Sequence, residues 1–250
     1  MKYTFQILFL IFFITTFSQS DPKETITFKA YDGVTITADL YFVHKKTAPF
    51  ILLFHQSGWS RGEYLEIAPK LNRMGFNCMA VDLRHGGEIN NVKNMTKTSA
   101  DKMHKKDTNI APLPDIQKAV DFVRENYSEG NLILWGSSFS AGLVLKYAGD
   151  NPEHIDGVIT FSPGEYYSAR ASNTFVRESA KNITCPVFIT SAKDEKKDWW
   201  QIYSVIPSKN KFWFLPVTSG NHGSKALWEK FEDNKAYWHA LTTFLVKYFD

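Results

Sequence analysis

The chain of 250 residues has only two cysteines, Cys78 and Cys185. Each begins an apolar run, so we expect two unpaired thiols in different core strands. The formal charge of +3 at pH 7 is too small to indicate a nucleic-acid partner or binding to a membrane surface. The sequence also lacks the H-E-x-x-H pattern, the P-loop and a G-x-G-x-x-G turn after a strand. We therefore expect no metal and no cofactor.

A long apolar run that could span a bilayer is missing as well. The stretch Ile7–Phe17 is shorter than the ~20 residues that a membrane-spanning helix needs. It follows the basic Lys2 and precedes Ser18-Gln19-Ser20, which is the layout of a cleaved secretory signal peptide over residues 1–20. The alternative is a membrane anchor. The prediction is export, to a periplasm or the extracellular space, without stable insertion into the membrane.

The remainder, residues 21–250, has a length typical of one large domain. Asp32-Gly33 joins two alternating strands into a hairpin. Strands are expected at 25–30, 34–43, 50–54, 77–81, 131–135, 157–161, 187–190 and 212–215. Helical periodicity covers 64–74, 116–127, 139–148 and 226–248, the last with an apolar stripe of Leu227, Phe231, Trp238, Leu241 and Leu245. Alternating strands and helices predict an α/β fold, a doubly wound and mostly parallel sheet of about eight strands with an antiparallel N-terminal hairpin.

Two connections are unusual. Residues 85–114 form a long lysine-rich stretch, which is typical either of a flap or binding loop or of a solvated surface excursion. Residues 162–184 have room for about one short helix. We therefore expect a minimal cap and an open site.

The most informative motif is Gly136-Ser137-Ser138, between the apolar run 132–134 and a predicted helix from Phe139. A serine on a tight strand-to-helix turn is typical of a nucleophile elbow, in which the strained backbone exposes the hydroxyl. Gly136 allows the turn, and the small residues 140–142 allow the helix to approach the sheet. Ser138 is the predicted nucleophile.

A serine hydroxyl needs a base, and the base needs an orienting acid. Asp194 follows the strand 187–190, and His222 lies between glycines after the strand 212–215. The chain order Ser, Asp, His is the order found on α/β-hydrolase sheets. We expect His222 to take the proton from Ser138 and Asp194 to orient the imidazole. Glu195 and Asp198 are alternative acids, whereas His239 falls within the last predicted helix.

The oxyanion of a tetrahedral intermediate needs backbone N–H donors. Phe139, which follows the nucleophile, supplies one expected donor. The other is expected from His55-Gln56-Ser57-Gly58 after the strand 50–54, with Ser57 preferred and Gln56 as the alternative. Ser60-Arg61-Gly62-Glu63 matches a capping box that would hold this loop in place.

Together these motifs resemble the α/β-hydrolase superfamily, and in particular its compact dienelactone-hydrolase-like and esterase branch. The resemblance covers nearly all of the chain after residue 20, and Val81–Gly87 is similar to the loop after that family's fourth strand. Ser140 stands at the second elbow glycine and Gln56 at the glycine after His55. A serine nucleophile differs from the cysteine of dienelactone hydrolases themselves.

The resemblance implies a secreted serine hydrolase that cleaves carboxylic esters through an acyl-serine intermediate. Its substrate would be a small-molecule or sugar-linked ester, and the oligomeric state is open. Aromatic residues near the predicted site are expected either to line a substrate pocket or to pack in the core. They are Trp59, Tyr166 and Trp199, followed by Tyr167 and Trp200. The alternatives are a serine peptidase or amidase of the same fold, and a catalytically idle binding protein.

Overall fold

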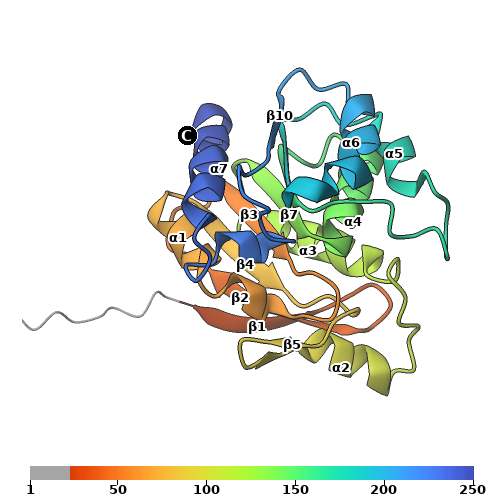
Figure 1. Ribbon diagram of the computed structural model, residues 1–250. Helices are drawn as coiled ribbons and strands as arrows, with labels where there is room; N and C mark the ends of the chain where they lie inside the picture. Colours follow the sequence, from red (N-terminus) through yellow and green to blue (C-terminus); the bar gives the residue numbers. More distant parts are fainter. Residues whose placement is uncertain (1–22) are drawn as a thin grey trace, which may run out of the picture.

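The computed structural model describes residues 23–250 (Figure 1), so the predicted signal peptide lies outside the described residues. Eight strands form one sheet in the order β1-β2-β4-β3-β7-β8-β9-β10. They are β1 (Glu24–Lys29), β2 (Thr35–Tyr41), β3 (Phe50–Phe54), β4 (Asn77–Val81), β7 (Leu132–Ser137), β8 (Gly157–Phe161), β9 (Val187–Thr190) and β10 (Lys211–Phe214). Strand β2 pairs antiparallel with β1 and β4, and all other pairs in this sheet are parallel. The predicted fold class is confirmed.

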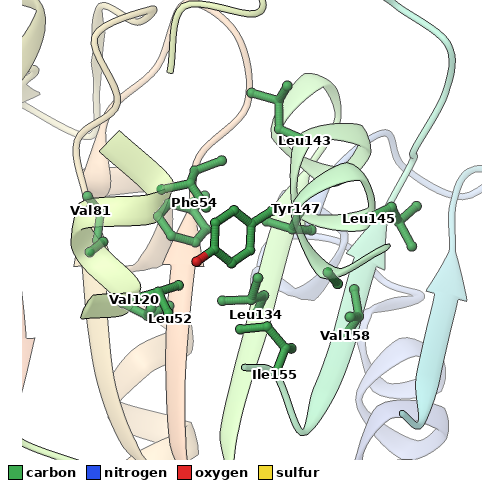
Figure 2. Packing of buried hydrophobic residues seen from close by; sticks show 14 of the residues in the cluster. Leu52, Phe54, Val81, Val120, Leu134, Leu143, Leu145, Tyr147, Ile155 and Val158 are labelled. Atoms are coloured by element: carbon green, nitrogen blue, oxygen red, sulfur yellow. The ribbon is translucent and has the colours of Figure 1, made fainter. Parts of the chain in front are cut away.

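Helices cover both faces of the sheet. One face packs against α1 (Ile67–Arg73) and α7 (Asn234–Phe249), and the other against α3 (Leu113–Asn126), α4 (Phe139–Asp150) and α6 (Lys196–Val205). Strand β3 explains this arrangement, because its residues are apolar on both sides: Phe50, Leu52 and Phe54 join one core, Ile51 and Leu53 the other. Figure 2 shows the first core around Tyr147 of α4.

The predicted helix 226–248 is interrupted. A 3-10 turn, η3 (Ser224–Leu227), ends at an extended Trp228, and α7 begins only at Asn234. The break lets the Trp228 indole donate to the Glu63 carbonyl at 2.9 Å and lets Asp233 accept from Thr218 at 2.7 Å. Tertiary contacts of these two side chains therefore override the helical periodicity.

The excursion 85–114 contains a small hairpin of β5 (Glu88–Ile89) and β6 (Val92–Lys93), then α2 (Met95–Lys102). Helix α2 lies against β2, where Thr96 Oγ1 accepts from the Thr37 N–H at 2.9 Å. Between β8 and β9 there is one short helix, α5 (Phe175–Ala180), as the length of that connection predicted. Within residues 23–250 no helix is long and apolar enough to cross a membrane.

Candidate active site

The residues of the candidate site follow the carboxyl ends of five neighbouring strands. Ser138 follows β7, Glu195 follows β9 and His222 follows β10. The loop 55–60 follows β3, and Ser162 directly follows β8. Because these strands are parallel, their carboxyl ends meet at one edge of the sheet, where α/β proteins bind their ligands.

Ser138 has the backbone of a nucleophile elbow. Its φ of 57° and ψ of −119° are strained for a residue with a side chain. Gly136 makes the turn possible, since a Cβ there would lie 2.5 Å from the Ala141 Cα. At the second elbow position the Ser140 hydroxyl accepts from the Ser137 N–H at 2.9 Å and donates to the Phe54 carbonyl at 2.7 Å. Ser140 therefore ties the elbow to β3, which a glycine would not do.

His222 lies between a hydroxyl and a carboxylate. Its Nε2 is 2.7 Å from Ser138 Oγ, and its Nδ1 is 2.6 Å from Glu195 Oε1. A carboxylate can only accept, so Nδ1 carries the proton, and the neutral ring offers Nε2 as acceptor for the Ser138 hydroxyl. This is the geometry of a nucleophile, a base and an orienting acid.

The carboxylate at His222 belongs to Glu195, not to Asp194, so the sequence-based choice of acid was wrong. Both residues lie in a 3-10 turn, η2 (Lys193–Glu195), in which successive side chains point about 120° apart. Asp194 is exposed and lies beside Lys196, Lys197 and Trp200 on the outer surface.

Ser162 and Ala192 hold Glu195 in place. Glu195 Oε2 accepts from the Ser162 hydroxyl at 2.6 Å and from the Ala192 N–H at 3.1 Å. Burial opposes ionisation of Glu195, but the hydrogen bonds from His222 and Ser162 outweigh it and lower the pKa of this carboxyl. Ser162 has a φ of 56° and also accepts from the Gly223 N–H at 2.9 Å. Sequence reasoning missed Ser162; its only signal is a polar residue at the carboxyl end of a buried strand.

The loop that carries His222 is fixed on both sides. Gly223 has a φ of 73°, and a Cβ there would lie 2.7 Å from Ser137 Oγ, so the turn requires glycine. The Tyr237 hydroxyl of α7 accepts from the Asn221 N–H at 3.2 Å and donates to the Ser191 carbonyl at 3.0 Å. Tyr237 therefore connects the loop of the base to the loop of the acid.

Two backbone N–H groups remain as candidates for the oxyanion donors. Phe139 is the first residue of α4, where an N–H has no partner within the helix. Within residues 23–250, the N–H of the exposed Ser57 donates to no protein acceptor. The Gln56 N–H, by contrast, donates to Glu63 Oε2 at 2.8 Å. Gln56 is thus excluded as the second donor in this conformation, and Ser57 is retained.

Glu63, like Ser162, has a role in the site that the sequence did not predict. Ser60 caps η1 (Arg61–Tyr64) as predicted, with its hydroxyl accepting from the Gly62 N–H at 3.2 Å. The Glu63 carboxylate does not complete the expected box, because it binds the Gln56 N–H and the Ser137 hydroxyl (2.7 Å) instead. Burial raises the pKa of Glu63 to about 7 despite the hydrogen bond from Ser137.

His55 also stabilises this loop, through hydrogen bonds of its buried ring. Burial lowers its pKa to about 4, so the ring is neutral. Its Nδ1–H donates to the Gln56 carbonyl at 2.9 Å, and its Nε2 accepts from the Leu83 N–H at 2.9 Å. His55 is therefore a structural residue that links the loops after β3 and β4.

The predicted pocket aromatics separate into different groups. Trp199 is fully buried and donates to Ser191 Oγ at 2.8 Å, so it belongs to the core and its assignment to a pocket was wrong. Tyr166 is 38% exposed, and its hydroxyl donates to the Ser162 carbonyl at 2.9 Å. Trp59 is half-buried and stacks on Trp228 with ring centroids 5.4 Å apart. Tyr166 and Trp59 remain candidates for substrate contact.

Comparison with known proteins identifies the family of this chain. The family model described as "Serine aminopeptidase, S33" matches residues 45–183, more than half of the chain. The chain belongs to this α/β-hydrolase family. The matched segment includes the loop 55–60, the elbow at Ser138 and Ser162, whereas Glu195 and His222 lie after its last residue. No curated protein shows a significant sequence match.

Solved structures share the fold of this S33 family member. A dienelactone hydrolase from Anabaena variabilis superposes with a TM-score of 0.71 at 13% identity, covering 93% of this chain and 100% of the other. The esterase Pf2001 from Pyrococcus furiosus gives 0.71 at 16% identity, with 92% and 94% covered. Est1E from Butyrivibrio proteoclasticus gives 0.68 at 14% identity, with 89% and 98% covered. At such identities the likeness establishes the fold alone.

Proposed function

We propose that the protein is an exported serine hydrolase that cleaves carboxylic esters through an acyl-serine intermediate. The observation that carries the proposal is the position of His222, with Nε2 at Ser138 Oγ and Nδ1 at Glu195 Oε1. A histidine held between a serine and a carboxylate activates the hydroxyl as a nucleophile, whereas a binding protein has no use for a strained serine beside an oriented base.

The reaction follows from the protonation states. Ser138 Oγ attacks the ester carbonyl carbon while its proton moves to His222 Nε2. The imidazolium is stabilised by Glu195, and the N–H groups of Phe139 and Ser57 bind the oxyanion. The C–O bond to the alcohol then breaks and the alcohol takes the proton from Nε2. Water, activated by the same nitrogen, attacks the acyl-serine and releases the acid.

Three carboxylates near Ser138 are already used by protein donors, which favours an ester over a peptide with a free amine. An aminopeptidase needs a carboxylate that is free to bind the substrate ammonium group. Glu195 is used by His222 and Ser162, and Asp107 by His85 and Lys97. Glu165, next to Tyr166, accepts from the N–H groups of Val176 and Arg177 at 2.9 and 2.8 Å.

The half-exposed His222 and the short connection 162–184 favour an open site for a small-molecule or sugar-linked ester. Trp59 and Tyr166 are the proposed contacts to its acyl or sugar group. Export is proposed from the layout of residues 1–20 alone. Mass spectrometry of the secreted product tests it, with Asp21 as the expected first residue and an uncleaved chain as the contrary result.

The experiment that tests the activity compares p-nitrophenyl esters with aminoacyl p-nitroanilides. Wild type should hydrolyse the esters, and Ser138→Ala and His222→Ala should each lose at least about 10³-fold in kcat while keeping the same melting temperature. Preferential cleavage of the anilides would favour the peptidase. Ester turnover by Ser138→Ala would refute the proposal.

A further inference from the structure

A second hydrogen-bonded series of Ser, His and Asp side chains borders the site and is separate from the triad. His85 Nε2 lies 3.0 Å from Ser57 Oγ, and His85 Nδ1 is hydrogen-bonded to Asp107 Oδ1. Because the carboxylate accepts from Nδ1–H, the neutral ring accepts the Ser57 hydroxyl at Nε2. The three residues come from the loop after β3, the loop after β4 and the excursion 85–114.

This chain of contacts reaches both oxyanion donors. Ser57 is the residue whose N–H we assign as the second donor. The His85 ring also packs edge-on against Phe139, with centroids 5.1 Å apart and an interplanar angle of 77°. His85 therefore contacts the two residues whose N–H groups would bind the oxyanion.

Asp107, the last residue of this series of contacts, is connected to the sheet through α2. Lys97 of α2 lies 3.3 Å from Asp107 Oδ2. Helix α2 is itself held on β2, where Thr96 and Ser99 accept from the N–H groups of Thr37 and Thr35. Lys97 thus connects Asp107 to α2, and the contacts continue through His85 to Ser57.

We infer that His85 is a positioning residue for the oxyanion loop, and that the excursion 85–114 serves to carry its partner Asp107. The inference rests on the proposed function. Ser57 is exposed and lies in a turn, so its N–H has freedom to move unless its side chain is held. Solvent-exposed pairs of this kind contribute little to stability. Their effect should therefore appear in the rate of the chemical step rather than in the melting temperature.

The test is a double-mutant cycle with Ser57→Ala and His85→Ala on a p-nitrophenyl ester. Ser57→Ala keeps the N–H and removes only the hydroxyl that holds it. Loss of an oxyanion donor costs about 10²–10³-fold in kcat, so a loosened donor should cost about 10-fold to 100-fold, with KM changed less than about 3-fold. The double variant should be no slower than the slower single variant, since the Ser57–His85 hydrogen bond is already lost in each of them.

Conservative and control variants sharpen the test. His85→Gln places an amide nitrogen near the position of Nε2, so it should recover most of the lost kcat. Asp107→Ala removes the acceptor for His85 Nδ1–H, so it should lower kcat as His85→Ala does. His154→Gln, at an exposed residue with no contact to Ser57, His85, Asp107 or Lys97, should stay within about 2-fold of wild type.

Two outcomes would overturn the inference. In the first, kcat of both Ser57→Ala and His85→Ala stays within 2-fold of wild type. In the second, the fold-loss in kcat of the double variant equals the product of the fold-losses of the two single variants. The test stays valid even if His85→Ala folds poorly, because Ser57 is an exposed turn residue and Ser57→Ala leaves the core unchanged. Failure of the proposed function is distinguished by Ser138→Ala, which would then retain activity whatever the residue at position 85.

Discussion

At the scale of single residues, the choice between two adjacent acids decides the geometry of the site. Glu195 and Asp194 are neighbours in one turn, yet only Glu195 reaches His222. The sequence predicted the strand end and the loop correctly, because both follow from local patterns. It could not show which of two consecutive carboxylates faces inward, since that depends on the phase of a 3-10 turn.

The two acids therefore give a matched pair of variants. Glu195→Gln removes the negative charge that stabilises the imidazolium and adds an amide N–H that favours the wrong tautomer of His222, so kcat should fall by about 10³–10⁴-fold. Asp194→Asn should stay within about 2-fold of wild type, because Asp194 is exposed and points away. Steady-state hydrolysis of p-nitrophenyl acetate measures both, and the reverse order of effects would contradict the assignment.

Glu63 gives a prediction on stability. Burial raises its pKa from 4.5 to about 7, so the folded protein holds a proton that the unfolded chain releases between these pH values. The free energy of unfolding should fall as pH rises through this window, by up to about 3 kcal/mol from this group. Above pH 7 the group is ionised in both states, and its contribution no longer changes.

Urea denaturation of wild type and Glu63→Gln from pH 4 to 8 measures this effect. Other titrating groups are common to both proteins, so the difference between their unfolding free energies isolates Glu63. Glutamine does not titrate, and the difference should change across the window. Two parallel curves would show that Glu63 keeps an ordinary pKa.

At the scale of elements, helix α7 connects the loops of the acid and the base through Tyr237. Its hydroxyl bonds the Asn221 N–H and the Ser191 carbonyl, on loops that follow β10 and β9. Periodicity alone predicted one helix over 226–248 and gave no reason for the break at 228–233. The break arises because Trp228 and Asp233 are used by distant partners, which no local pattern contains.

Tyr237→Phe should lower the free energy of unfolding by about 1–3 kcal/mol, since it leaves the buried Ser191 carbonyl without this donor. It should also lower kcat, because the two loops lose their common contact. Tyr203→Phe is the matched control: its hydroxyl lies 3.4 Å from the Lys211 carbonyl, so its removal should change stability by less than about 0.5 kcal/mol. Equal effects of the two substitutions in urea denaturation would argue against the role of Tyr237.

At the scale of the whole molecule, the site exists only because five strand ends meet at one edge of the sheet. Four of these strands were readable because β3, β7, β8 and β9 are apolar runs with both faces buried, and the fifth, β10, is a partly exposed apolar run. The positions of Ser138 and His222 followed from this pattern and from the turn residues around them. The supports were not readable, because Ser162, Glu63 and the pair His85–Asp107 act through contacts between segments far apart in the chain.

The central claim is that this assembly makes the Ser138 hydroxyl nucleophilic. The most direct measurement is to treat the folded protein with a fluorophosphonate and locate the adduct by tandem mass spectrometry. We predict one stoichiometric adduct on Ser138 that is absent after heat denaturation before labelling and strongly reduced in His222→Ala. No adduct, or an adduct on another residue such as Ser57 with Ser138 unmodified, would contradict the account.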